Sequence, residues 1–115
     1  MDKRRRGSAY EKIAVEYLEN HCLKIVKTNY HISQGEVDII ALDGDILAFI
    51  EVKYRKDTAF GCPWEAVSLA KQRRICRAAE HYCYSRQVNR QIRYDVISIC
   101  GEEIEWFKDA FEHGS

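Results

Sequence analysis

GEVDIIALDGDILAFIEVK, residues 35–53, is the stretch that decides the fold of this chain. It holds two apolar runs rich in β-branched residues, and Asp43-Gly44-Asp45 between them is a turn signal. Two such runs joined by an Asp-Gly turn are typical of a β-hairpin. Side chains alternate along a strand, so Val37 and Ile39 are predicted to face away from Asp38.

The length of the hairpin loop decides which charged residues meet. In the second strand, Glu51 and Lys53 share one face. A loop with an even number of residues puts Asp38 on that same side, whereas an odd loop without a bulge separates them. With an even loop, the hairpin brings two carboxylates and one ammonium together at the end of an apolar sheet.

Charge in such a place has two interpretations. Buried charges cost free energy unless they are paired or bound to a metal, and two neighbouring carboxylates repel each other until a divalent cation relieves the repulsion. Carboxylate oxygens suit Mg²⁺ or Mn²⁺, and Lys53 would then orient a water or neutralise charge on a phosphoryl oxygen. The alternative is a solvated Glu51–Lys53 pair on an edge strand. The spacing of Asp38, Glu51 and Lys53 favours metal chemistry.

The same residues resemble the PD-(D/E)XK nuclease superfamily, whose members hold a divalent metal for phosphodiester cleavage. Asp38 matches the first acidic position, with Val37 in place of the proline, and Glu51 and Lys53 match the E-x-K element. More closely, the chain resembles the YraN-like family of small nuclease-like proteins, which are similar to archaeal Holliday-junction resolvases. The matching residues extend over nearly the whole chain: Glu11, Ala14, Tyr17, Leu18, Asn29, Tyr30, Gly35 to Asp38, Phe49 to Lys53, Arg55, Phe60, Gly61 and Arg93 to Val96.

This resemblance implies a fold and a site. The fold is an α/β/α restriction-endonuclease-like core of three layers, with one mixed sheet flanked by helices. Asp38 and Glu51 are implied as ligands of Mg²⁺ or Mn²⁺, Lys53 as the residue that assists the attacking water, and Glu11 as a third carboxylate that completes the metal shell.

Length and composition set the outer bounds. The chain has 115 residues, 46% of them hydrophobic, which predicts a single domain over residues 1–115. Neither a membrane-spanning run nor a signal peptide is recognisable, so a cytoplasmic protein is expected. Five cysteines without a Cys-x-x-Cys pair are interpreted as buried free thiols.

The formal net charge is zero, but the charges are unevenly distributed. Basic residues concentrate at residues 3–6, 53–56 and 71–93, and acidic ones in the hairpin and the last residues. A neutral total with a polarised surface is compatible with binding a polyanion on one face.

Glu11 has two possible roles. Ser8-Ala9-Tyr10-Glu11 has the form of a capping box, which predicts a helix from about Ser8 to Asn20 or His21. Glu11 is then either the third residue of the cap or the third carboxylate of the metal site, and the two roles are compatible through a bridging water.

The second half of the chain supplies candidate nucleic-acid contacts. After the hairpin, residues 54–64 mix cations with aromatic residues, a composition that contacts phosphates and stacks on bases, and Arg55 and Lys56 are the candidates. A helix is predicted from Trp64 or Glu65 to about Ser85. Lys71 at its apolar boundary could reach a phosphate. Gln72, on the apolar face, would bond either a catalytic water or carboxylate, or a neighbouring backbone carbonyl.

Three further strands complete the prediction. They span residues 24–29, 92–100 and 103–107, and the tail from residue 109 is expected to be frayed. The expected function is that of a metal-dependent endonuclease on DNA, plausible for structured or branched DNA and compatible with a homodimer. The alternatives are a nucleic-acid-binding protein with this fold but without cleavage, and a structural partner that docks another protein through an exposed strand.

Overall fold

The computed structural model describes residues 3–55 and 67–113. Two helices and five strands follow one another along the chain: α1 (Lys3–Asn20), β1 (Lys24–Ile32), β2 (Gly35–Asp43), β3 (Ile46–Arg55), α2 (Leu69–Ser85), β4 (Ile92–Cys100) and β5 (Glu103–Phe111).

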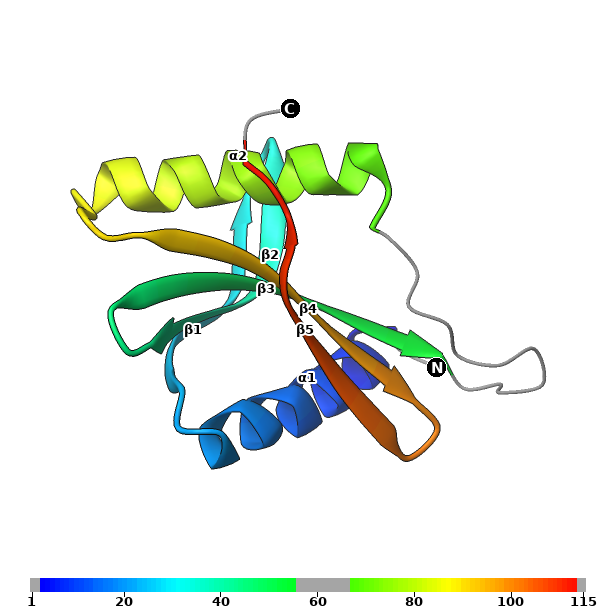
Figure 1. The fold of residues 1–115 in the computed structure, drawn as a ribbon. Coiled ribbons are helices and arrows are strands. Elements are labelled where there is room, and N and C mark those ends of the chain that lie inside the picture. The colour runs from blue at the N-terminus through cyan, green and yellow to red at the C-terminus, as the bar shows by residue number, and fades with distance from the viewer. Residues whose placement is uncertain (1–2, 56–66, 114–115) are drawn as a thin grey trace.

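The five strands form one mixed sheet in the order β1-β2-β3-β4-β5. β3 and β4 are parallel, joined by a crossover that contains α2, and the other neighbours are antiparallel. α2 covers one face of the sheet and α1 the other (Figure 1). The predicted fold class, three α/β/α layers around one mixed sheet, is confirmed.

Each helix closes its own hydrophobic cluster against the sheet. On the α2 face, Phe49 packs with Ile75 and Ala79 of the helix. On the α1 face, Ala14 and Leu18 pack against strand residues of the central sheet. The central strands are therefore covered on both sides, which explains why residues 35–53 read as nearly continuous apolar runs.

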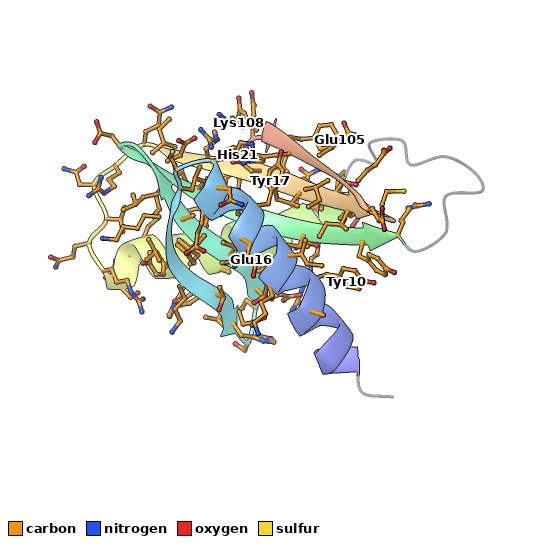
Figure 2. All side chains as sticks on the ribbon, turned by 90° about the horizontal axis from the view of Figure 1, so that it is seen from below. Tyr10, Glu16, Tyr17, His21, Glu105 and Lys108 are labelled. Atoms are coloured by element: carbon orange, nitrogen blue, oxygen red, sulfur yellow. The ribbon has the colours of Figure 1, made fainter. Side chains whose placement is uncertain are left out.

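The C-terminal end of α1 reaches the far edge of the sheet. Figure 2 shows α1 crossing in front of the strands, with Tyr17 and His21 near β5. The His21 ring lies 4.2 Å from the Tyr17 ring and 5.9 Å from the Trp106 ring, measured between centroids. The residue that follows the helix thus contacts β5, while the helix itself lies over β1, β2 and β3.

The hairpin has the even loop on which the meeting of the charged residues depends. Asp43 lies opposite Ile46, which leaves Gly44 and Asp45 as a two-residue turn. Gly44 has a φ of 61°, a left-handed conformation that glycine adopts without steric cost.

α1 begins earlier than predicted. The helix already runs from Lys3, so Ser8 lies inside it and the prediction of a capping box there is wrong. Its end at Asn20 is as predicted. Cys22, with a φ of 70°, turns the chain, and the Leu23 N–H bonds the Leu18 carbonyl. Bonds of this kind satisfy the last carbonyls of a helix.

α2 begins later than predicted. Ser68 is its N-cap, and the Ser68 side chain accepts a hydrogen bond from the Lys71 N–H at 3.1 Å. The helix therefore starts at Leu69, not at residue 64 or 65, which lie outside the described residues. The apolar periodicity extended into the connection and concealed the serine cap.

β5 extends to Phe111, so the prediction of a strand ending at residue 107 is wrong. The fully buried Asp95 of β4 holds this extension. Its carboxylate accepts hydrogen bonds from the Trp106 indole N–H at 3.0 Å and from the Asp109 N–H at 2.9 Å. The Phe111 ring also stacks on Tyr94.

Other predictions meet the structure in part. β1 continues to Ile32, three residues beyond its predicted end. Cys22, Cys76 and Cys83 are free thiols, although Cys22 is exposed, and Cys100 is disulfide-bonded, contrary to prediction. Cys62 lies outside the described residues. Neither helix, over the part of the chain that is described, is long and apolar enough to cross a membrane.

Candidate functional site

The two central strands part next to Asp38. β2 pairs with β3 as far as Ile39 opposite Ile50, while β3 continues beside β4 to Arg55. Beyond this point the Asp38 carboxylate bridges the strands, because its Oδ2 accepts a hydrogen bond from the Val52 N–H at 2.8 Å. The Asp38 side chain is thereby fixed in the fork between β2 and β3.

The predicted alternation of β2 fails at this fork. Val37 packs with Ile40 in the cluster on the α2 face, whereas Ile39 packs in the cluster on the α1 face. The prediction that Val37 and Ile39 face the same way is therefore wrong. Beyond Ile39, β2 pairs only with β1, which leaves it free to twist.

Asp38 and Glu51 come together in the fork. The register that pairs Ile39 with Ile50 places Asp38 level with Glu51, and the two carboxyl groups lie within hydrogen-bonding reach. Glu51 is only 7% exposed. Burial, and then the charge of Asp38, raise the pKa of Glu51 to about 8. Its Oε1 is buried and has no hydrogen-bond partner among the described residues.

Lys53 lies two residues further along β3 and is half-buried. Its positive charge acts on Glu51 and opposes the rise in the pKa of that carboxyl group. The next residue, Tyr54, stacks on Tyr10 of α1 with ring centroids 3.5 Å apart. Because neighbouring side chains alternate, Lys53 faces away from α1, on the same side as Glu51.

Two further cations come from α2: Lys71, which the sequence predicts as a phosphate contact, and Arg74, which it does not. Lys71 Nζ lies 3.0 Å from Glu36 Oε1 and 3.8 Å from Glu51 Oε2. Arg74 binds Glu36 through two nitrogens, with Nη2 2.6 Å from Oε2. The hydrogen bond from Arg74, together with Lys71, lowers the pKa of Glu36 to about 2.

Glu11 approaches from α1. Its Oε1 accepts a hydrogen bond from Asn29 Nδ2 at 2.7 Å. Burial and the charge of Asp38 raise the pKa of Glu11 to about 7, against the effect of the Asn29 hydrogen bond. Because α1 begins at Lys3, Glu11 is not the third residue of a cap. It is a partly buried carboxyl group within electrostatic range of Asp38.

Of the four residues predicted to contact nucleic acid, Lys71 has an ion pair with a residue of the fork. Arg55 is exposed at the end of β3, and Lys56 lies outside the described residues. Lys71 contacts Glu36 and Glu51. Gln72 Nε2 donates to the Val67 carbonyl at 2.8 Å, so the backbone alternative for this amide is the one observed.

The fork offers two carboxylates as ligands for a metal ion. Across residues 3–55 and 67–113, no three or more His, Cys, Asp and Glu side chains form a ready cluster for a metal. Asp38 and Glu51 nevertheless offer adjacent carboxylates, one with a buried oxygen that has no partner among the described atoms. Mg²⁺ is commonly bound through one or two carboxylates and several waters. The pair fits such an ion.

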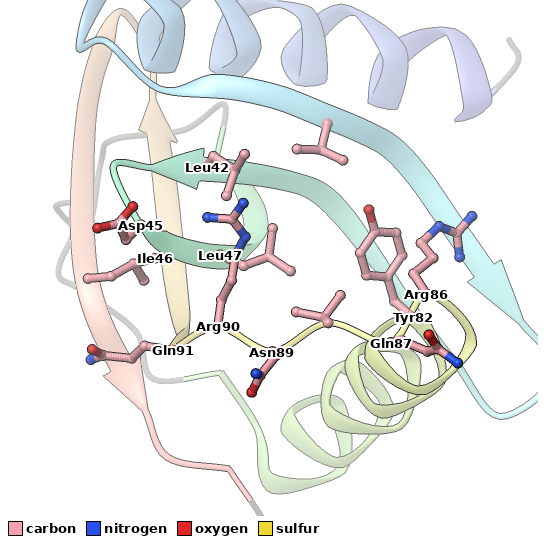
Figure 3. A pocket seen from close by; sticks show the side chains of 12 residues that line it. Leu42, Asp45, Ile46, Leu47, Tyr82, Arg86, Gln87, Asn89, Arg90 and Gln91 are labelled. Carbon is pink, nitrogen blue, oxygen red and sulfur yellow. The ribbon is translucent and has the colours of Figure 1, made fainter.

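A pocket of about 680 Å³ lies elsewhere, beside the hairpin turn and the C-terminal end of α2. Its walls include Leu42, Tyr82, Arg86 and Arg90 (Figure 3). None of its lining residues belongs to the fork. The chemistry of the carboxylates, and not the size of this pocket, therefore identifies the candidate site.

Two residues beside the site had a signal in the sequence. Glu36 follows Gly35 at the start of β2. Asn29, which hydrogen-bonds Glu11, is among the residues that carry the family resemblance, and its φ of 53° is a conformation that asparagine tolerates better than most residues. The position of Lys71 over the fork depends on how α2 packs on the sheet, and no local sequence pattern predicts that packing.

Fold and site together define a class of protein: an α/β/α domain with an acidic pair and lysines at the fork of its two central strands. The chain belongs to the uncharacterised protein family UPF0102, whose profile matches residues 10–99. It is 41% identical to a UPF0102 protein of Chromohalobacter salexigens, covering 96% of this chain and 94% of the relative. It is also 44% identical to one of Idiomarina loihiensis, covering 91% and 95%, and 41% identical to one of Dictyoglomus turgidum, covering 92% and 94%.

Proposed function

We propose that this protein is a divalent-metal-dependent endonuclease that hydrolyses phosphodiester bonds in DNA, with structured or branched DNA as its substrate. The observation that carries the proposal is the Asp38–Glu51 pair in the fork. These are two adjacent carboxyl groups, one buried, with an oxygen that no described group satisfies. The resemblance of Asp38, Glu51 and Lys53 to the PD-(D/E)XK pattern supports the same chemistry.

Asp38 and Glu51 would hold Mg²⁺ or Mn²⁺, and Glu11 would complete the shell through a water. When bound, such an ion polarises a phosphoryl oxygen and lowers the pKa of a coordinated water. The Val52 N–H keeps the Asp38 carboxylate oriented in the fork by its hydrogen bond to Oδ2. A fixed ligand spares the reorganisation that a mobile side chain would need.

Lys53 would act on the reacting phosphate. Its ammonium is on the same side of β3 as Glu51 and close enough to influence that carboxyl group. In this position it would neutralise charge that develops on a phosphoryl oxygen and orient the attacking water.

DNA would approach along exposed cations around the fork. Arg55 is exposed at the end of β3, and Arg77 is exposed on α2. Contacts between arginines and phosphate oxygens carry no information about base sequence, which suits recognition of DNA shape. Lys56, next to Arg55 in sequence, is proposed to take part in the same contact.

A second candidate function is binding of nucleic acid without cleavage. One observation favours it: the Lys71 ammonium, 3.8 Å from Glu51, already compensates negative charge in the fork. A protein that uses the fold only for binding would need no metal ion at that position.

A cleavage assay separates the two functions. Single-stranded, duplex, flap and four-way DNA would be incubated with the protein and Mg²⁺ or Mn²⁺, and with the Glu51→Gln variant. Glu16→Gln is the matched control, because Glu16 is an exposed glutamate on the outer part of α1. We expect cleavage by the wild type and the control and none by Glu51→Gln. Binding of DNA without cleavage by any form would favour the second candidate.

A further inference from the structure

The side chain of Lys71 stands between two acidic groups. One is Glu36, whose Oε1 it hydrogen-bonds at 3.0 Å, and the other is Glu51, whose Oε2 it approaches to 3.8 Å. Lys71 belongs to the first turn of α2, and its backbone N–H is held by the Ser68 side chain. The capped helix therefore fixes the point from which the ammonium reaches the fork.

The fork needs a positive charge. The Glu51 side chain is 9% exposed and lies beside the Asp38 carboxylate. Neighbouring buried carboxylates raise the free energy of the folded protein unless a cation or a proton compensates them. In the described part of the chain, Lys71 is the cation with an ion-pair contact to Glu51. It supplies the compensation that a divalent ion would otherwise supply.

The two contacts of Lys71 are unequal. The contact with Glu36 is a hydrogen bond, while the contact with Glu51 is a longer ion pair. Glu36 is itself fixed by Arg74, which donates from Nε at 3.1 Å and from Nη2 at 2.6 Å. The ammonium can therefore leave Glu51 by side-chain rotation and keep its hydrogen bond to an anchored partner.

We propose that Lys71 is an internal counter-ion of the fork, which neutralises Glu51 when no divalent ion is bound and withdraws to Glu36 when one binds. The inference rests on the proposed function, since it assumes a metal at Asp38 and Glu51. Lys71 and the ion then compete for the same carboxylate. The competition sets the divalent concentration at which the site loads, and Glu36 is a positioning residue that lowers this concentration.

The test is the affinity for Mg²⁺, measured by titration calorimetry at pH 8.5 and in 0.5 M salt to screen distant charges. Lys71→Met removes the competing ammonium and is expected to tighten Mg²⁺ binding roughly tenfold. Glu36→Gln removes the charge that holds Lys71 away from Glu51 and is expected to weaken binding. Arg73→Met is the control, because Arg73 is an exposed cation on the same helix and should change affinity less than about twofold.

The outcomes distinguish this inference from the proposed function. Equal Mg²⁺ affinity in the wild type and Lys71→Met, with binding lost in Asp38→Asn, overturns the counter-ion role and leaves the metal site standing. Absence of Mg²⁺ binding in both the wild type and Lys71→Met overturns both. If Arg73→Met tightens Mg²⁺ binding as much as Lys71→Met does, the effect is due to the net charge of the protein, and the inference is also overturned. If Lys71→Met does not fold, Lys71→Gln carries the same expectation.

Discussion

Replacing Asp38 with Asn tests whether the crowded carboxylates of the fork exist for function. The substitution removes one negative charge and nearly preserves the shape of the side chain. The amide oxygen of the new side chain can still accept the hydrogen bond that Val52 N–H now gives to Asp38 Oδ2 at 2.8 Å. The change therefore isolates the electrostatic repulsion between positions 38 and 51.

The size of the effect follows from the pKa of Glu51. A rise from 4.5 to about 8 means that at pH 7 this group opposes folding by about 3 kcal/mol. Burial is the larger cause and Asp38 the second, so removing the Asp38 charge relieves only part of this cost. If the pKa of Glu51 falls by roughly one unit, the variant without metal is more stable by about 1 kcal/mol, which raises Tm by about 4 °C.

Thermal melts of the wild type and Asp38→Asn, each with and without Mg²⁺, provide the measurement. Mg²⁺ at about 100 times its Kd should stabilise the wild type by about 2.7 kcal/mol and leave the variant unchanged. Asp45→Asn is the control, since Asp45 is exposed in the turn of the same hairpin. A structural ion pair predicts the reverse, a loss of about 3–5 kcal/mol in the variant. That loss, together with a wild type indifferent to Mg²⁺, would refute the reasoning.

Three further predictions concern packing, pH and DNA. A Cβ at Gly35 would lie 1.9 Å from a backbone oxygen of α2. Gly35→Ala should therefore lower the free energy of unfolding, measured in urea, by at least about 2 kcal/mol. Gly44→Ala is the control and should cost less, because its Cβ would meet nothing within 4 Å. The pKa of Glu51 is raised to about 8, so the stabilisation from its protonated form is complete below pH 4.5 and is lost as pH rises to about 8. Without metal, Tm should therefore fall between about pH 5 and pH 8. A Tm that does not change over this range would contradict the prediction. Arg55→Ala should weaken DNA binding and reduce its dependence on salt. If the wild type and Arg55→Ala bind DNA with equal affinity in titrations at two salt concentrations, Arg55 does not belong to the interface.

The hairpin was predictable because its determinants are local. Two apolar runs and a glycine-containing turn fix the strands, and the even loop then fixes which side chains share a face. The register of the hairpin then places Asp38 level with Glu51. The twist of β2 at the fork, which moves Val37 to the α2 face, was not predicted by the alternation of side chains along the strand.

The rest of the site depends on tertiary packing. Lys71 reaches Glu51 because α2 crosses the sheet at one particular place, and no pattern within the helix specifies that place. The start of α2 was predicted wrongly because the apolar periodicity continues before Ser68, whereas the helix begins after the Ser68 cap. Asp95 carried a visible signal, an acidic residue inside an apolar strand, but its partners Trp106 and Asp109 become neighbours only after β5 pairs with β4.

The parallel pairing of β3 with β4 has a consequence for the order in which the chain folds. The β1–β2–β3 meander joins strands that are adjacent in sequence, whereas β4 can pair with β3 only after the segment that contains α2 has crossed the sheet. Such long loop closures are slow compared with hairpin formation. Asp38 and Glu51 should therefore face each other first in a water-exposed hairpin, where their repulsion is small. The docking of α2 then withdraws them from water and delivers Lys71 in the same step, so no folding intermediate has to bury the two carboxylates before their counter-charge arrives.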